Sequence, residues 1–310
     1  MAQLVSVVVP THNRVERLPR ALESVFGQSW PELEVIVVND GSSDGTAEYL
    51  SAAAANEPRL RVVSHGHPRG APEARNTGID AATGALIAFL DDDDVWFPDK
   101  VRRQATQLLD RDGVGAVTCH HEIAVELQGP AVPFVGPDTC TRDELLWDNF
   151  LGSTTFCMWR RDALPRQPRF DPTVINGHDW DLWIQCAVQA RVEVIPEVLC
   201  RYVAHHGDRI TRSSPNRAAG RRRIVEKYGD LMSPACRQFN LARATILDGP
   251  PPRGEAKALA RLLAGGQLRA ARMLVAASVA GRLGDRAGDP GRGARRLHDL
   301  VRAATRERAS

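Results

Sequence analysis

Residues 85–100 read ALIAFLDDDDVWFPDK, an apolar run followed at once by four aspartates. The run at 85–90 is typical of a strand that is buried on both faces, so the aspartates at 91–94 stand where that strand ends. Like charges at one point repel and raise each other's pKa, which leads us to expect a positively charged partner there. This stretch predicts a functional site at a strand end.

The rest of the first half predicts the sheet to which that strand belongs. Three earlier apolar runs read as strands, at residues 4–9, 33–38 and 60–63. Helix-like segments alternate with the strands, at roughly residues 14–26, 46–55 and 72–82. This alternation predicts an α/β fold with a mostly parallel central sheet and helices on both faces.

Polar, turn-forming residues follow three of the four predicted strands. They are PTHNR at 10–14, NDGSSDGT at 39–46 and DDDD at 91–94. Ligands of parallel sheets bind at the carboxyl ends of the strands, so we expect the three segments to share one crevice.

The second half predicts a less regular arrangement. We expect helices at 98–110, 143–150 and 179–190, strands at 115–118 and 192–202, and an edge strand at 154–159. Residues 129–137 are rich in Pro and Gly and predict a loop. GPPPRG at 249–254 predicts a linker before a helical tail.

Composition is ordinary for a soluble globular protein, with 43% apolar and 25% charged residues among 310. The six cysteines are scattered, with no C-x-x-C pair and no zinc-like spacing, which predicts reduced thiols in a cytoplasmic protein. No apolar stretch reaches the ~20 residues that a spanning helix needs. We expect the N-terminus to be a first strand rather than a signal peptide.

Charge is unevenly distributed along the chain. Residues 249–310 hold thirteen basic side chains against five acidic ones, a net charge of +8, so residues 1–248 carry −6 of the chain's total of +2. A basic helical tail predicts peripheral contact with an anionic membrane or an acidic partner, packing on the body, or self-association. Nucleic acid is not an expected partner because aromatic residues are scarce in the tail.

The four aspartates match the preferences of a hard divalent cation. Mg²⁺ and Mn²⁺ take oxygen ligands, usually one or two carboxylates together with substrate phosphates. Alternate residues of an extended segment point the same way, so we expect Asp91 and Asp93 to reach the ion while Asp92 and Asp94 point elsewhere.

Two further motifs suit a nucleotide. Asp40 follows the second predicted strand, where a carboxylate can accept hydrogen bonds from a ribose or a base, although NDGSSDG is equally typical of a tight turn. Arg75 lies in PEARNTG at the start of a predicted helix, and a helix N-terminus beside a guanidinium favours a diphosphate.

Acidic residues and histidines in the second half are the remaining candidates. GHDWDL at 177–182 places Asp179 in the first turn of a helix, as a candidate general base. The neighbouring Asp181 is equally well explained by helix electrostatics. His205 and His206 follow the last predicted strand of the body, and one of them is a candidate for a metal or phosphate contact.

Together these segments resemble glycosyltransferase family 2, the inverting nucleotide-sugar transferases of the GT-A fold. The resemblance is carried by SVVVPTHNR (6–14), LEVIVVNDGSSDGT (33–46), the stretch 72–100 and GHDWDLWIQCA (177–187). It spans about the first 210 residues and leaves out the tail. It implies a Rossmann-like, mostly parallel sheet with helices on both faces, followed here by a C-terminal α-helical extension.

The resemblance also implies a reaction, the transfer of a sugar from a nucleoside-diphosphate sugar, UDP-sugar by default, to an acceptor hydroxyl in glycan or glycosylated natural-product synthesis. Mg²⁺ or Mn²⁺ would be held by Asp93 and Asp91, with His206 as a further candidate ligand. Asp179 would be the catalytic base. The donor pocket would be lined by Pro10, Thr11, Asn13, Arg14, Asp40, Arg75, Asp91 and Asp92.

The resemblance also predicts a division of labour along the chain. We expect a nucleotide-sugar-binding half at 1–120, an acceptor-binding and catalytic half at 121–248 and a basic helical tail at 249–310. His178 stands where the family usually has Glu, so the acceptor contact is expected to differ.

Two other functions fit part of the sequence. IAFLDDDDV also matches the hhhhDxDxV motif of haloacid-dehalogenase phosphatases, with Asp91 as nucleophile and Asp93 as acid, although three strands with their own end motifs precede it here. A nucleotide-sugar-binding module without catalysis is the second alternative. Dinucleotide oxidoreduction is not expected, because the first strand ends in PTHNR rather than G-x-G-x-x-G.

Overall fold

The computed structural model describes residues 2–124, 130–137, 139–164, 169–174, 176–204, 214–248, 253–264, 271, 274–275, 295 and 297–302. The chain forms two compact units that interleave along the sequence. The first comprises Met1–Pro133, Gly152–Pro172 and Gln185–His205, and the second Phe134–Leu151, Thr173–Ile184 and His206–Ser310. The division of labour at residues 120 and 248 stays a prediction.

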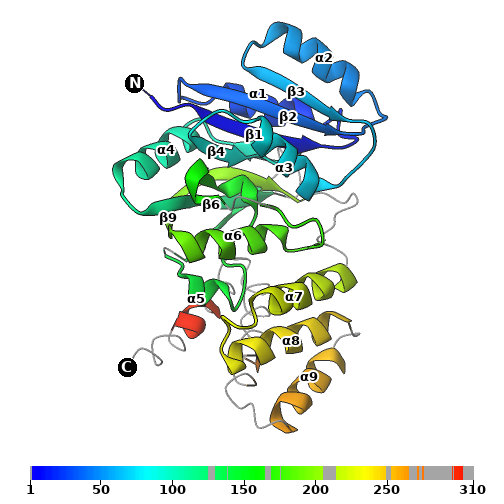
Figure 1. The fold of residues 1–310 in the computed structure, drawn as a ribbon, viewed down its shortest axis with the longest axis vertical. Helices are drawn as coiled ribbons and strands as arrows, with labels where there is room; N and C mark the ends of the chain where they lie inside the picture. Colours follow the sequence, from blue (N-terminus) through cyan, green and yellow to red (C-terminus); the bar gives the residue numbers. More distant parts are fainter. Residues whose placement is uncertain are drawn as a thin grey trace. The chain divides into compact units, whose positions relative to one another are not determined.

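A mixed sheet of nine strands among the described residues forms the centre of the first unit (Figure 1). Its order is β3-β2-β1-β4-β8-β6-β9-β5, and β7 pairs with β6. The strands are β1 (Val5–Thr11), β2 (Leu33–Asp40), β3 (Leu60–His65), β4 (Leu86–Phe89), β5 (Val95–Trp96), β6 (Val114–Ala124), β7 (Ala131–Phe134), β8 (Met158–Arg160) and β9 (Arg191–Val203).

The first four strands confirm the predicted parallel arrangement. β2 and β4 both run parallel to β1, and β3 runs parallel to β2. Every residue of β1 is buried. This agrees with its apolar sequence, since continuous apolar runs are typical of strands covered on both faces. The predicted α/β class with a mostly parallel sheet is confirmed.

Helices of the first unit follow the predicted order. They are α1 (Leu18–Phe26), α2 (Thr46–Asn56), α3 (Ala71–Ala81) and α4 (Lys100–Asp110), and α6 (His178–Gln189) begins in the second unit and ends in the first. The first helix was expected from Arg14, but that prediction is wrong. It begins at Leu18 with Pro19 in its first turn, where a proline costs no hydrogen bond.

Glycine allows α3 to lie close to the sheet. A Cβ atom on Gly78 would stand 2.2 Å from Cγ1 of Val8 in β1, which is closer than two non-bonded carbon atoms can approach. The glycine in the PEARNTG motif therefore has a packing role, since it lets α3 carry Arg75 against the sheet.

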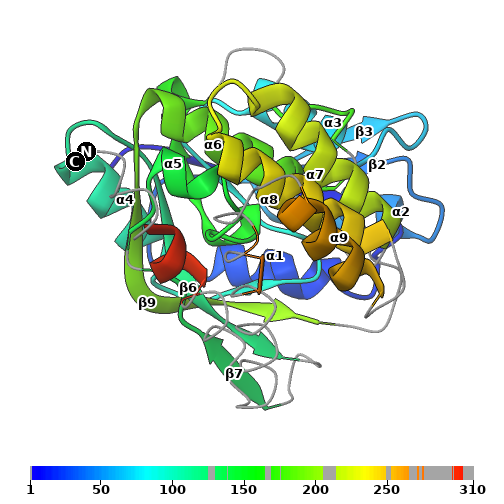
Figure 2. The ribbon, with the colours of Figure 1, turned by 90° about the horizontal axis from the view of Figure 1, so that it is seen from below.

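Two predictions for the second half of the sheet are wrong, and a third strand is longer than predicted. The segment expected as an edge strand forms the short helix η1 (Thr154–Phe156) and then β8, which lies between β4 and β6 and is antiparallel to both. The buried Trp159 of β8 packs edge to face on Phe89 at 5.2 Å, which explains the central position. The predicted Pro/Gly loop contains β7, which Figure 2 shows beside β6. The strand at 115–118 extends to Ala124.

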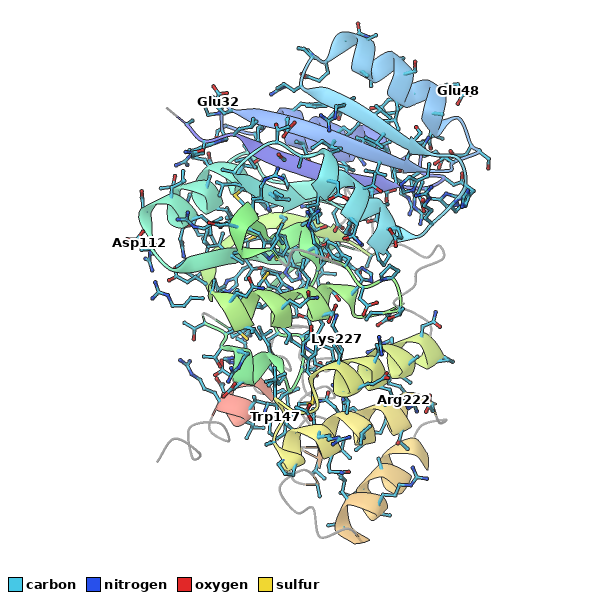
Figure 3. The ribbon with its side chains drawn as sticks, in the orientation of Figure 1. Glu32, Glu48, Asp112, Trp147, Arg222 and Lys227 are labelled. Atoms are coloured by element: carbon cyan, nitrogen blue, oxygen red, sulfur yellow. The ribbon has the colours of Figure 1, made fainter. Side chains whose placement is uncertain are left out.

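The second unit is helical in its described residues. Besides the start of α6 it contains α5 (Arg142–Leu145), α7 (Ser214–Tyr228), α8 (Pro234–Asp248) and α9 (Arg253–Ala264). Lys227, labelled on α7 in Figure 3, donates to the buried carboxylate of Asp181 at 2.8 Å. Asp181 therefore joins α6 to α7 rather than only favouring a helix N-terminus.

No helix in the described part of the chain is both long and apolar enough to cross a membrane. The six cysteines all lie in described positions and are not joined by disulfides.

Candidate functional site

Loops from neighbouring parallel strands meet at the carboxyl edge of the first unit's sheet. Thr11 at the end of β1 pairs with Asn39 of β2, and Asp40 pairs with His65 at the end of β3. Val8 of β1 pairs with Phe89 at the end of β4, so the loops that carry PTHNR, NDGSSDGT and DDDD leave the sheet at one level, as the sequence predicts.

Asn13 joins the loops that follow β1 and β2. Its backbone N–H donates to Ser42 Oγ at 3.0 Å, and its side-chain oxygen accepts from the N–H of Ser43 at 2.8 Å. Its φ of 53° lies in the left-handed region, which Asn tolerates better than most residues. The side chain thus fixes the second loop, while Pro10 and Thr11 are buried in β1 below it.

Asp40 holds the loop between β3 and α3. Its Oδ1 accepts from the N–H of Arg69 at 2.8 Å and lies 2.7 Å from Nδ1 of His65, and its Oδ2 accepts from the N–H of Gly70 at 2.8 Å. Burial raises the pKa of Asp40, but these hydrogen bonds outweigh it and leave the pKa below its ordinary value. The carboxylate is therefore an ionised acceptor whose two oxygens already bind this loop.

Arg75 points at the first aspartate of the turn. Its guanidinium is 2.5 Å from Oδ1 of Asp91 and lies over the ring of Phe170 at 5.6 Å. Oδ2 of Asp91 accepts from Ser153 Oγ at 3.0 Å, and its N–H donates to Thr155 Oγ1 at 3.0 Å. Asp91 is therefore fixed from both sides.

Residues 91–94 form a turn rather than an extended segment. The N–H of Asp94 donates to the carbonyl of Asp91 at 3.1 Å, because the chain reverses between β4 and β5. We expected Asp91 and Asp93 to point the same way because alternate residues of an extended segment do so. That reasoning is wrong here, because the segment is not extended.

The two middle aspartates repel each other. Burial, and then the charge of Asp93, raise the pKa of Asp92 to about 7. Oδ1 of Asp92 is 3.9 Å from Nε of Arg14, whose side chain is partly exposed and so can also meet an anionic ligand.

Asp94 belongs to the core. It is buried, and its Oδ1 accepts from the N–H of Val203 at the end of β9 at 3.0 Å. Burial, followed by the charges of Asp93 and Asp91, raises its pKa well above the ordinary value. Asp94 thus anchors β9, and three aspartates remain for a ligand.

Asp179 lies in the second unit, on the first turn of α6. One of its oxygens accepts from the N–H of Trp180 at 2.8 Å and the other from the side-chain amide of Asn149 at 3.3 Å. The carboxylate and the adjacent His178 are only partly buried. The predicted contacts of His205 and His206 fall outside the described residues.

Sequence reasoning missed the residues that position the carboxylates. Ser153 and Thr155 hold Asp91. Thr155 lies in the segment interpreted as an edge strand, and Ser153 lies just before that segment. His65 lies between Asp40 and Thr77, whose Oγ1 is 2.9 Å from Nε2 of the imidazole. Only the three-dimensional register brings these residues to the edge of the sheet.

The aspartate turn suits a divalent cation. Asp91, Asp92 and Asp93 offer carboxylate oxygens at the edge where sheet ligands bind, and these are the donors that Mg²⁺ and Mn²⁺ prefer. The raised pKa of Asp92 reflects a repulsion that a bound cation would remove. The residues present therefore fit the metal.

Comparison with known proteins supplies a family. The model described as glycosyl transferase family 2 matches residues 6–166. A putative teichuronic acid biosynthesis glycosyltransferase of Bacillus subtilis, TuaG, is 33% identical over 182 residues, which cover 58% of this chain and 71% of the relative. WfgD of Escherichia coli, a UDP-Glc:alpha-D-GlcNAc-diphosphoundecaprenol beta-1,3-glucosyltransferase, is 27% identical over 62% of this chain and 73% of its own.

Solved structures share the fold. TarS of S. aureus in complex with UDP-GlcNAc superposes with a TM-score of 0.64 at 20% identity, covering 97% of this chain and 92% of its own. The mannosyltransferase PcManGT of Pyrobaculum calidifontis, in complex with GDP-Man and Mn²⁺, gives a TM-score of 0.61 at 23% identity over 100% of this chain and 88% of its own. At these identities the likeness shows the fold alone.

Proposed function

The chain belongs to glycosyl transferase family 2 and is an inverting glycosyltransferase, and we propose that its reaction is metal-dependent sugar transfer in the synthesis of a bacterial polysaccharide. The sugar would pass from a nucleoside-diphosphate sugar to an acceptor hydroxyl. The observation that carries the proposal is the aspartate turn after β4, where the carboxylate of Asp92 lies beside Arg14 of the loop that follows β1.

Asp93 and Asp91 are proposed to hold Mg²⁺ or Mn²⁺, with Asp92 beside them. When bound, the cation would supply positive charge against the diphosphate of the donor, which such ions bind readily. Because Arg75 already pairs with Asp91, we propose that it orients that carboxylate, in place of the predicted direct contact with the diphosphate. Arg14, partly exposed beside Asp92, is the better placed of the two arginines to meet the donor.

The loops of the first three strands are proposed to form the nucleoside pocket. Pro10 and Thr11 would form its floor and Asn13 would fix its wall. Asp40 holds the backbone N–H groups of Arg69 and Gly70, so we propose that it shapes the pocket in addition to any contact with the ribose or base.

Asp179 is proposed as the general base. It would take the proton from the acceptor hydroxyl, whose oxygen then attacks the anomeric carbon while the bond to the nucleoside diphosphate breaks on the opposite face. A single displacement inverts the anomeric configuration, and no enzyme nucleophile is required. The hydrogen bonds from Asn149 and from the N–H of Trp180 hold the carboxylate of Asp179 in one orientation.

The proposed donor is a UDP-sugar. WfgD is named for UDP-Glc and TarS is bound to UDP-GlcNAc, whereas PcManGT is bound to GDP-Man. TuaG is named for teichuronic acid biosynthesis, and the acceptor in the name of WfgD is a GlcNAc on diphosphoundecaprenol, so we propose a glycan acceptor. His178 is proposed to alter the contact that Glu makes in the family. Contact of the basic tail with a membrane or a second copy stays a prediction.

The phosphatase alternative is wrong, because the glycosyl transferase family 2 model matches residues 6–166, which include the aspartate turn. The alternative of a binding module without catalysis predicts binding without turnover, and this difference can be measured.

A thermal-shift screen of nucleotide sugars with Mn²⁺ tests the donor assignment. A ligand that binds only the folded state raises the melting temperature, and we expect a UDP-sugar to do so in Mn²⁺ but not in EDTA. A shift with GDP-sugars alone would replace the proposed donor, and a shift in the presence of EDTA would contradict the metal dependence.

A further inference from the structure

A second cluster of ligand-type side chains lies in the second unit, apart from the aspartate turn. Ligand atoms of Cys140, Glu144 and His298 all lie within 4.8 Å of one another. The exposed fractions of the three residues are 5%, 2% and 2%. A thiol, a carboxylate and an imidazole thus meet at one buried point, although their spacing in the sequence gives no sign of it.

The start of α5 fixes two of the three residues. Thr141 caps this helix, and its N–H donates to Oε2 of Glu144 at 2.7 Å in a capping box. Cys140 directly precedes the cap, so its thiol and the carboxylate of Glu144 both lie at the start of α5. His298 comes from the helical residues 297–302, the red segment that lies beside α5 in Figure 1.

Ion pairing explains only part of this cluster. Nε2 of His298 lies 3.3 Å from Oε2 of Glu144, yet this buried nitrogen makes no well-directed hydrogen bond. Nε of Arg302 approaches the other oxygen of Glu144 at 3.6 Å, and its side chain is 41% exposed, so it can turn to solvent. A salt bridge accounts for Glu144, His298 and Arg302. The thiol of Cys140 is not part of it and makes a long contact, 3.8 Å, with the carbonyl oxygen of Thr141.

We propose that Cys140, Glu144 and His298 bind a zinc ion. Sulfur, nitrogen and oxygen donors together suit Zn²⁺, with water in the fourth position, and they do not suit Mg²⁺ or Mn²⁺, which prefer oxygen alone. Binding replaces the proton of the Cys140 thiol with the metal and releases that proton to solvent. The thiolate and carboxylate would neutralise the ion, since each contributes one negative charge.

The site would fasten the basic tail to the body of the second unit. Two ligands come from residues 140–144 and the third from residue 298, so the ion would close a loop of more than 150 residues. The ring of His298 also packs edge on against Phe150 at 5.0 Å. This role does not depend on the proposed donor or acceptor.

The test uses the full chain, stripped with a chelator and then titrated with Zn²⁺ in the presence of excess Mg²⁺ to saturate the aspartate turn. Zinc is measured by elemental analysis, and Co²⁺ replaces Zn²⁺ to reveal thiolate coordination by its charge-transfer absorption. The variants are C140A and H298A. C236A is the matched control, because Cys236 is a buried cysteine of the same unit outside the cluster.

We expect one tightly bound zinc per chain in the wild type and in C236A, and affinity at least about 100-fold weaker in C140A and H298A. The Co²⁺ thiolate band should vanish in C140A and persist in an Asp93→Ala variant. Equal zinc affinity in the wild type, C140A and H298A would overturn the proposal, as would a wild type that binds no zinc, and would leave an ion pair at this point. Circular dichroism confirms that each variant is folded.

Discussion

Replacing Arg75 by Met should lower the free energy of unfolding far more than replacing an ordinary surface arginine would. The Arg75 side chain is 6% exposed and that of Asp91 is 24% exposed, and the two are 2.5 Å apart. Removing one partner of a buried ion pair leaves the other charge uncompensated, at a cost of about 3–5 kcal/mol. Asp91 is partly exposed and keeps its contact with Ser153, so we expect the lower end, about 3 kcal/mol.

Urea unfolding of R75M measures this loss, and R103M is the matched control. Arg103 pairs with Glu197, and both side chains are about 40% exposed, so their pair should contribute at most about 1 kcal/mol. The double variant R75M/D91N should lose about 2 kcal/mol less than the sum of the single variants, because the removed partners share one interaction.

Equal losses in R75M and R103M would refute the claim that Arg75 is a buried partner of Asp91. The donor provides a second check on its role. If Arg75 acts through Asp91, R75M should weaken donor binding by no more than D91N does, because D91N also removes a proposed metal ligand. A loss confined to R75M would mean that the guanidinium contacts the diphosphate directly.

Three further predictions concern pH, catalysis and packing. Burial, then the charge of His120, lowers the pKa of His121 from 6.5 to about 3. Stability that is present above pH 6.5 is therefore lost as the pH falls, by about 2 kcal/mol at pH 5. H121F should not show this loss when urea unfolding is compared above pH 6.5 and at pH 5. D179N should bind donor like the wild type but transfer sugar about 100-fold to 10,000-fold more slowly in single-turnover assays. G78A should cost about 1–3 kcal/mol in urea unfolding, and V8A should recover part of it, since the added methyl meets that valine.

Three outcomes would contradict these predictions. A parallel decline of H121F and the wild type at pH 5 would assign the acid sensitivity to other groups. Unchanged transfer in D179N would remove Asp179 from catalysis. Full stability of G78A would show that α3 can move away from β1 without cost.

The parallel half of the sheet could be predicted because its strands are continuous apolar runs with polar residues at their ends. The aspartate stretch could be placed at the ligand edge for the same reason. The orientation of its side chains could not, because the hydrogen bond from Asp94 to Asp91 makes the segment a turn. The period-two rule holds only for extended chain.

Contacts between distant segments were not predictable from the sequence. β8 is only three residues long, and its central position depends on the packing of Trp159 against Phe89. Likewise Ser153 reaches Asp91 across 62 residues, and His298 reaches Glu144 across a still longer stretch. Local pattern carries no information on such pairs, because each side chain alone is typical of a surface or a turn.

The most direct test of the central claim measures the release of nucleoside diphosphate from a UDP-sugar. The acceptor need not be known for this assay, because water can slowly take the place of the acceptor. We predict release in Mn²⁺, none in EDTA, a loss of at least about 100-fold in D93A, and wild-type release in D110A, which removes an exposed aspartate at the end of α4. Release that continues in EDTA, or that is equal in D93A and the wild type, would contradict a metal-dependent reaction at the aspartate turn.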